Sequence, residues 1–508
     1  MSLSFLHRLT LAIVLAGTLH SASAEDTSKS PRQPAGEQTV AERREPAKGV
    51  LRLLPADAVT EHSIDTSRGK LAYTATAGTL AFYDQSGEQS AAVFYTAYVA
   101  KTAATNRPLT FVFNGGPGAA SAFLHLGLVG PRILDFGQDQ HDVTRAALRD
   151  NPDTWLSFTD LVMIDPIGTG WSRAVKGEDG KHFWSVRSDA DATAKAIALY
   201  VTKNNRIGSP KYLFGESYGG FRAAKTARVL QRDRGITVNG IVMLSPLLEG
   251  WLTFGDDSSA LHAALQLPSL AAAELERKRA FTTEALAAAE KFAMTDYLTT
   301  LAGASLKGDS AKAFYSRVAH MTGLPLDTVT QARGFAARAY VKSLRAGESK
   351  IVSRYDAAFA VDDPHPESRS SRGPDPILDT ITRAYGGAMA SYARNELGFK
   401  TEMTYQLLAG DVTRGWDWEG KRGSVGAESD VRVLLSFSPT FRLLIAHGVS
   451  DMVTPYAASR YVIDHLPAFT PPGRVALKLY RGGHMLYLDP ASRKAFSADA
   501  AAFYPGGE

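Results

Sequence analysis

The chain has 508 residues, of which 44% are hydrophobic and 21% charged, and its formal net charge is +4. This composition is ordinary for a globular protein, and the length allows one large core with an insertion, or two domains. The net charge is too small for this length to indicate nucleic-acid binding, and no cluster of basic residues interleaved with aromatic residues occurs.

The N-terminus has the pattern of a secretory signal peptide. His7 and Arg8 precede the apolar run 9–19, and the Ala-Ser-Ala tripeptide 22–24 fits a small-residue cleavage site. The apolar run is too short to span a membrane well, so we expect no stable membrane insertion. The chain has no cysteine, so its export would require no disulfide, which is typical of a large bacterial protein. We expect residues 1–24 to be removed and the protein to be periplasmic or secreted from a bacterium.

After the signal peptide, a polar leader gives way to strands. Residues 25–49 are rich in Ser, Pro, Glu, Lys and Arg, which predicts a flexible leader. Residues 70–76 and 91–99 are rich in Thr, Tyr, Val and Phe, which favours antiparallel strands at the start of a sheet. Apolar runs separated by helix-length segments then predict a mostly parallel α/β sheet. These runs begin at Leu109, Leu161, Tyr212, Ile241 and Leu443.

A glycine-rich turn follows the first of these apolar runs. The strand expected at 109–113 leads into the sequence Asn-Gly-Gly-Pro-Gly at 114–118. Because they lack a Cβ atom, Gly115 and Gly116 let the backbone approach a substrate oxygen and point an N–H group at it. We therefore predict that the amides of Gly116 and Tyr218 form an oxyanion hole, with Gly115 at the substrate.

The sequence Gly-Glu-Ser-Tyr-Gly at 215–219 carries most of the functional information. An apolar run, 212–214, precedes it and a helix-like segment, 221–231, follows it. Strand, sharp turn and helix are the context of the Gly-x-Ser-x-Gly nucleophile elbow of α/β-hydrolases, which exposes the serine hydroxyl. We therefore predict that Ser217 is a nucleophile on an α/β-hydrolase fold.

The regular alternation of strands and helices stops after the strand at Ile241. Residues 270–304, 309–320 and 326–346 have helical composition and spacing, and 362–376 reads as a polar loop. We expect 247–431 to be a mainly helical cap inserted into a hydrolase core made of 50–246 and 432–508. Its aromatic residues are either candidates for the pocket or part of the cap's own core. They are Trp251, Phe254, Tyr385, Trp416 and Trp418.

The partners of Ser217 are expected near the C-terminus, because α/β-hydrolases place the acid and then the histidine after the serine. Asp451 follows the apolar run 443–446, and His484 follows the strand-like segment 475–480. His484 would act as the general base, and Asp451 would orient its imidazole ring. His447 also lies at a strand end, but it precedes Asp451 and breaks the expected order.

These motifs together resemble the serine carboxypeptidase family. The resemblance implies an α/β-hydrolase fold, a triad of Ser217, Asp451 and His484, and an oxyanion hole from Gly116 and Tyr218. The sequence shows no metal-ligand spacing, and we expect no cofactor or metal to be needed. The resemblance also implies that Asn114 and Glu216 help to bind the free C-terminal carboxylate of a peptide. The motifs that carry it are NGGPG at 114–118, Asn151-Pro152-x-x-Trp155, DPIGTGWS at 165–172, GESYG at 215–219 and Gly483-His484-Met485.

Three positions depart from the pattern of this family. Val112 replaces a tryptophan, and Ala119 replaces a cysteine held in a disulfide. A second carboxylate-binding glutamate is expected just before Gly130-Pro131, but Leu128 lies there and no acidic residue occurs between Gly118 and Gly130. The recognition of a substrate carboxylate is therefore incomplete.

The sequence favours a serine carboxypeptidase that forms an acyl-enzyme on Ser217. An esterase or acyltransferase that uses the same triad on a non-peptide acyl substrate is the alternative, and Val112 and Leu128 favour it. A non-catalytic binding protein on the same fold would not need the serine, acid and histidine together.

Overall fold

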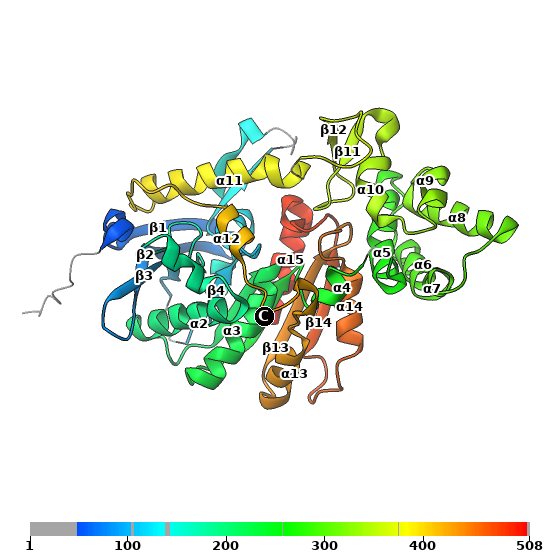
Figure 1. Cartoon of the computed structure of the whole chain (residues 1–508). Helices are drawn as coiled ribbons and strands as arrows, with labels where there is room; N and C mark the ends of the chain where they lie inside the picture. The colour runs from blue at the N-terminus through cyan, green and yellow to red at the C-terminus, as the bar shows by residue number, and fades with distance from the viewer. Residues whose placement is uncertain (1–47, 103–105, 138–142, 257, 374, 505–508) are drawn as a thin grey trace, which may run out of the picture. The chain divides into compact units, whose positions relative to one another are not determined.

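A central sheet of ten strands organises the part of the chain that the computed structural model describes (Figure 1). The described residues are 48–102, 106–137, 143–256, 258–373 and 375–504. The strand order is β1-β2-β3-β7-β4-β9-β10-β13-β14, and β8 pairs with β3 at one side. The strands are β1 (Ala58–Thr66), β2 (Gly69–Tyr83), β3 (Gln89–Ala100), β4 (Leu109–Phe113), β7 (Asp160–Ile164), β8 (Arg173–Ala174), β9 (Lys211–Glu216), β10 (Gly240–Leu244), β13 (Arg442–Gly448) and β14 (Val475–Tyr480).

The N-terminal third of the sheet is antiparallel, as the sequence predicts. β1 pairs with β2, β2 with β3, and β3 with β7, all in antiparallel register. Along most of β1 the side chains alternate between exposed and partly buried, because this strand lies at the edge of the sheet with one face toward solvent. The chain then changes to parallel pairing from β7 onward.

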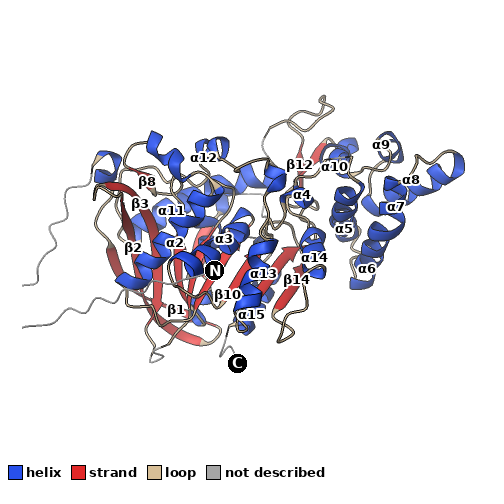
Figure 2. Cartoon of the chain, turned by 60° about the horizontal axis from the view of Figure 1, so that its bottom comes forward, coloured by secondary structure: helices blue, strands red, loops and turns tan. Residues whose placement is uncertain are grey.

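The parallel strands β4, β7, β9 and β10 are buried along their whole length, because helices cover both faces of the sheet (Figure 2). One face packs against α2, α3, α13 and α14, and the other against α11, α15 and the segment 122–129. These helices are α2 (Val186–Lys203), α3 (Tyr218–Asp233), α11 (Pro376–Asn395), α13 (Glu428–Phe437), α14 (Tyr456–Asp464) and α15 (Pro490–Phe503).

The expected insertion, 247–431, divides into parts that pack differently. Its first part has a hydrophobic core of its own, which includes Leu267, Phe292 and Tyr340. Its elements are α4 (Gly250–Thr253), α5 (Ala260–Arg277), α6 (Thr283–Phe292), α7 (Leu298–Ala302), α8 (Gly308–Thr322), α9 (Leu326–Gln331), α10 (Ala337–Ser343), β11 (Lys350–Val352) and β12 (Ala360–Asp362). The described residues from 48 to 504 nevertheless belong to one compact unit.

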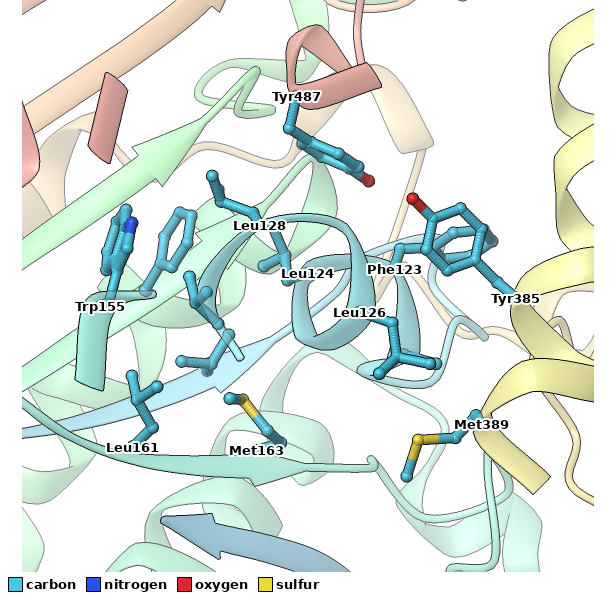
Figure 3. Close-up of a cluster of buried hydrophobic side chains, with 14 of the residues drawn as sticks. Phe123, Leu124, Leu126, Leu128, Trp155, Leu161, Met163, Tyr385, Met389 and Tyr487 are labelled. Atoms are coloured by element: carbon cyan, nitrogen blue, oxygen red, sulfur yellow. The ribbon is translucent and has the colours of Figure 1, made fainter. Parts of the chain in front are cut away.

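The second part of 247–431 packs into the core of the sheet. α11 begins where Asp375 accepts a hydrogen bond from the N–H of Ile377 at 3.0 Å and Pro376 occupies the first helical position, so the predicted polar loop ends in a helix start. Tyr385 and Met389 of α11 then join the buried cluster that contains Phe123 and Trp155 (Figure 3). The predicted boundaries of the cap stay a prediction.

The remaining regular elements are short. They include the hairpin strands β5 (Arg132–Asp135) and β6 (Ala147–Asp150), the helices α1 (Ala122–Leu124) and α12 (Gly410–Gly415), and a π-helical turn, His125–Val129. The signal peptide expected at 1–24 and nearly all of the leader expected at 25–49 lie outside the described residues. Over the residues that can be described, none of the helices combines the length and the apolar character needed to span a bilayer.

Candidate active site

The nucleophile elbow forms as the sequence predicts, between β9 and α3. Ser217 has φ 60° and ψ −125°, a conformation that is strained for a residue with a side chain. The turn closes because Gly215 and Gly219 lack side chains. A Cβ atom on Gly215 would lie 1.9 Å from the Gly219 carbonyl oxygen, and one on Gly219 would lie 2.7 Å from that of Phe113. The backbone N–H of Ser217 donates to the carbonyl of Leu244 at 2.9 Å, which fixes the elbow to β10.

Asp451 and His484 meet at the carboxyl ends of the neighbouring strands β13 and β14. Nδ1 of His484 lies 2.8 Å from Oδ2 of Asp451. The other oxygen of Asp451 accepts hydrogen bonds from the N–H groups of Val453 at 2.7 Å and Thr454 at 3.1 Å. Both side chains are buried. Burial opposes a charge on His484, but the Asp451 carboxylate outweighs it and raises the pKa of the imidazole.

The backbone of His484 is held from two directions. Its N–H donates to the carbonyl of Tyr355 at 2.6 Å, and its carbonyl accepts from the Ser245 hydroxyl at 2.9 Å. The Tyr355 ring also lies edge-on to the imidazole, with ring centroids 5.2 Å apart. Gly483 permits this contact, because a Cβ atom there would lie 1.9 Å from the Tyr355 carbonyl oxygen. Backbone and ring contacts therefore fix the position of the imidazole.

His447, the competing histidine, makes different contacts. It is fully buried within β13, and its Nε2 lies 2.8 Å from the Ser459 hydroxyl of α14. Burial lowers the pKa of His447 to about 4, so it is neutral at physiological pH. This geometry favours His484 over His447 as the partner of Asp451.

The two predicted oxyanion donors lie in the same cavity as Ser217. Gly116 has φ +99°, which favours glycine, and Tyr218 is the first residue of α3. Neither backbone N–H donates to another group in the described part of the chain. Gly115 allows the two loops to approach, because a Cβ atom there would lie 2.6 Å from the Tyr218 nitrogen. Both amides are therefore available to a substrate oxygen.

Asn114 and Glu216 form a hydrogen-bonded pair next to Ser217. The side-chain amide of Asn114 donates to Oε2 of Glu216. The Tyr487 hydroxyl donates to the same carboxyl group, 3.2 Å from Oε2 and 3.3 Å from Oε1. Burial raises the pKa of Glu216 to about 7, although His484, Tyr487 and Asn114 act in the opposite direction. Glu216 can therefore be present as a neutral acid below neutral pH.

A buried leucine, Leu128, lies at the position of the second carboxylate-binding acid. Leu128 lies in the π-helical turn His125–Val129 and is fully buried in the cluster of Figure 3, which also holds Tyr487 and Tyr385. The hydroxyl groups of Tyr487 and Tyr385 point toward one another there. Glu216 thus has a tyrosine hydroxyl as a hydrogen-bond donor in addition to Asn114. Tyr487 was not predicted from the sequence as a partner of Glu216, although it lies only three residues after His484 and could have been considered as a site residue for that reason.

A cavity of about 140 Å³ brings the predicted site residues together. Its lining includes every one of them except Asp451, which reaches it through His484. Tyr355, Leu247, Thr454 and Arg422 line it too and were not predicted. Of the five aromatic residues singled out in the sequence, Phe254 lines the cavity. Trp416 and Trp418 pack edge-on against the Tyr218 ring, Tyr385 lies in the core, and Trp251 is half exposed.

The other motifs hold the loops of the site in place. The Asn151 side chain donates to the carbonyls of Leu128 and Gly130, both at 2.8 Å. Asp165 accepts from the backbone N–H and the hydroxyl of Ser121, just after the glycine-rich turn. Trp155 stacks on Phe214 of β9, with ring centroids 4.6 Å apart. These residues act on the site through the backbone that they support.

A buried ion pair lies behind the elbow and was also missed. Nε of Arg222 in α3 donates to Asp189 of α2 at 2.7 Å, and its Nη1 donates to the carbonyl of Asn114. The arginine therefore ties the glycine-rich turn to the helix after Ser217. Across the described ranges there is no cluster of three or more His, Cys, Asp or Glu side chains that could bind a metal ion.

A comparison with protein families gives a match over most of the chain. The model of the serine carboxypeptidase family matches residues 71–470. Among curated proteins, serine carboxypeptidase-like 44 of Arabidopsis thaliana is 28% identical over 170 residues, 31% of this chain and 33% of that protein. Serine carboxypeptidase-like 35 of the same plant is 25% identical over 166 residues, 32% of this chain and 33% of that protein. The chain thus spans about a third of the length of these relatives.

Among solved structures, the chain is similar to Kex1, a prohormone-processing carboxypeptidase from Saccharomyces cerevisiae. The TM-score is 0.53 and the sequence identity 14%, over 85% of this chain and 91% of that one. This similarity shows a shared α/β-hydrolase fold.

Proposed function

Since the chain belongs to the serine carboxypeptidase family and is a serine hydrolase, we propose that it removes C-terminal residues from peptides. The observation that carries the proposal is the pairing of Asn114 with Glu216 beside Ser217. A neutral carboxyl group and an amide can both donate to a carboxylate, which suits a site for a free peptide C-terminus.

The reaction uses Ser217, His484 and Asp451. His484 accepts the hydroxyl proton as the Ser217 oxygen attacks the scissile carbonyl, and Asp451 stabilises the imidazolium through the bond to Nδ1. The amides of Gly116 and Tyr218 donate to the oxyanion. His484 returns the proton to the leaving amine as the C–N bond breaks, which leaves an acyl group on Ser217. Water then attacks the ester, with His484 again as the base, and releases the shortened peptide.

The pKa of Glu216 predicts how the binding of free-acid peptides depends on pH. Because its pKa is about 7, Glu216 is protonated below neutral pH and can donate to the substrate carboxylate. Above neutral pH it becomes an anion and repels the carboxylate. Binding of peptides with a free C-terminus should therefore weaken as pH rises through 7.

An esterase or acyltransferase that uses the same triad remains a second candidate. The observation that favours it is that Leu128, at the position where the family has its second carboxylate-binding acid, is buried in the hydrophobic core. Such an enzyme would not require a free carboxylate on its substrate.

The test compares three forms of one blocked dipeptide: the free acid, the C-terminal amide and an ester. A fluorophosphonate probe first establishes that Ser217 reacts, with Ser217→Ala as the control. A carboxypeptidase cleaves the free acid, with a KM that rises with pH, and cleaves the amide poorly. Equal cleavage of free acid and amide at every pH, or cleavage of the ester alone, would favour the second candidate.

We also propose that the protein is exported, on the pattern of residues 1–24 in the sequence. Mass spectrometry of the mature N-terminus tests this, and an N-terminus near residue 25 is the expected result.

A further inference from the structure

Arg422 is a cation at the active-site cavity with no acidic partner in the described part of the chain. Arg422 lines the same cavity as Ser217 and is exposed to solvent. Its guanidinium makes no hydrogen bond and no ion pair with any residue that the structure describes. Two other arginines near the site are occupied, since Arg222 pairs with Asp189 and Arg173 donates to backbone carbonyls. A guanidinium keeps its charge at every physiological pH, so Arg422 presents a permanent positive charge.

Aromatic rings hold the guanidinium in place. Its central carbon lies 3.7 Å from the ring centre of Phe254 and 5.2 Å from that of Trp418. Stacking on ring faces orients the planar group without using its N–H donors, which lie in the plane. Burial against its surroundings lowers the pKa of Arg422, and the nearby charge of Arg354 adds to this effect, whereas the Tyr355 side chain opposes it. The group is therefore positioned to accept an anion from outside the chain.

Backbone hydrogen bonds connect Arg422 to the elbow. The short 3-10 turn Arg422–Ser424 is followed by Val425, whose carbonyl accepts from the N–H of Gly250 at 2.7 Å. The N–H of Ala427 donates to Leu248 at 2.8 Å, and that of Leu247 donates to the carbonyl of Ser217 at 3.1 Å. The position of Arg422 is thus fixed relative to the nucleophile by a few short links.

The contacts of Arg422 lead to Tyr218, whereas those of Glu216 lead to Asn114 and Tyr487. The aromatic ring of Trp418, on which Arg422 rests, packs on Tyr218, the residue after the nucleophile, with ring centroids 5.7 Å apart. Glu216 precedes the nucleophile and bonds to Asn114 and Tyr487 instead. If the C-terminal carboxylate of the leaving residue binds at Glu216, Arg422 is left to face the acyl part of the substrate.

We propose that Arg422 binds an anionic group on the acyl portion of the substrate, so that the enzyme favours an acidic residue before the scissile bond. This inference rests on the proposed function. The substrate class is a peptide, or another acyl compound, with a carboxylate side chain at the residue that becomes attached to Ser217.

The test uses blocked dipeptides Xaa-Ala with a free C-terminus, in which Xaa is Glu, Gln or Lys, and blocked esters of the same three residues. Glu and Gln have nearly equal size, so their kcat/KM ratio isolates the charge. We expect the wild type to prefer Glu over Gln about tenfold at low salt, because a charge-assisted pair is strong but partly screened at this exposure. The preference should decrease as ionic strength rises.

Arg422→Met, which keeps an unbranched apolar stem, should reduce the Glu/Gln ratio to about one, and Arg422→Glu should invert the preference toward Lys. Lys421→Met is the matched control, because it removes one positive charge at the adjacent exposed position and should leave the ratio unchanged. Arg354→Met tests whether Arg354, the other cation near Arg422, causes the preference for Glu, and it should leave the Glu/Gln ratio unchanged.

Two results would overturn the inference, and a third would overturn the proposed function instead. Efficient turnover with equal rates for Glu and Gln would reject it and leave the proposed function intact. A preference for Glu that survives in Arg422→Met, or that disappears only in Arg354→Met, would reject the assignment to Arg422. If no peptide is cleaved although the probe labels Ser217, the proposed function fails, and the ester series then decides whether Arg422 selects acidic acyl groups.

Discussion

Glu216 and Tyr218 flank Ser217 in the chain, yet their surroundings differ in charge, exposure and hydrogen bonding. On the Glu216 side, a buried carboxyl group is held by Asn114 and Tyr487. On the Tyr218 side, aromatic rings lead to Arg422, which is exposed and makes no side-chain hydrogen bond or ion pair with the residues described. The charge of the first side depends on a proton, whereas that of the second is permanent. One cavity can therefore combine a pH-dependent receptor with a pH-independent one.

The largest expected effect comes from removing Ser217 or His484, which serve both the Glu216 side and the Tyr218 side of the cavity. Ser217→Ala and His484→Ala should each lower kcat by about 10⁴-fold or more, since both groups act in the same step. Steady-state kinetics with circular dichroism as a check on folding measures this. A severe loss in His447→Ala together with a mild loss in His484→Ala would contradict the choice of base.

The next effect concerns the stability cost of the buried acid. The pKa of Glu216 is 4.5 in a model peptide and about 7 in the folded protein. Between these pH values the unfolded chain has released the proton and the folded protein keeps it, so the free energy of unfolding decreases as pH rises and levels off above 7. The loss is roughly 3 kcal/mol. Urea unfolding from pH 4.5 to 8 should show this decrease in the wild type and a shallower one in Glu216→Gln. Parallel curves for the two proteins would show that Glu216 titrates normally.

Glu216→Gln should also remove the pH dependence of substrate binding. A glutamine side chain donates hydrogen bonds at any pH, so KM for a free-acid peptide should no longer rise above neutral pH. The difference from the wild type at pH 8 should be about tenfold, the effect of one charged contact. Esters without a free carboxylate serve as the control and should respond little. A KM that rises equally in both proteins would argue against a carboxylate receptor at Glu216.

The smallest effect concerns Tyr487. Its hydroxyl donates to Glu216 and favours the ionised carboxylate, so Tyr487→Phe should raise the pKa of Glu216 further. The rise of KM with pH should move to higher pH by about half a unit to one unit, the scale of one hydrogen bond. Tyr385→Phe is the matched control, because it deletes the same atom from a neighbouring ring that makes no hydrogen bond to Glu216. An equal shift in both variants would indicate a general change in packing.

Local patterns in the sequence were sufficient to predict the elbow, the glycine-rich turn and a mostly parallel sheet. Each depends on a few adjacent residues, such as Gly215 and Gly219, whose missing side chains permit the turn. The predicted antiparallel start and the α/β-hydrolase fold are confirmed. The roles of the site residues stay predictions, although the structure brings them to one cavity.

Contacts between distant segments could not be predicted. Tyr487 and Glu216 are 271 positions apart, and no periodicity links them. The sequence showed that Leu128 replaces an acid but gave no sign that a tyrosine supplies a donor to Glu216. Arg222 and Arg422 were likewise not singled out in the sequence. Such pairs depend on tertiary packing, which short patterns do not encode.

The carbonyl of Tyr355, which receives the N–H of His484, has a consequence for how this fold could be recombined. Tyr355 belongs to the segment between β11 and β12, which is far along the sequence from β13 and β14, the strands that precede Asp451 and His484. It reaches His484 because Gly483 leaves room. A chimaera that exchanged the insertion for that of a relative would therefore also exchange an anchor of its histidine. Libraries that vary substrate preference through this insertion should keep 353–357 unchanged and randomise the loops around them.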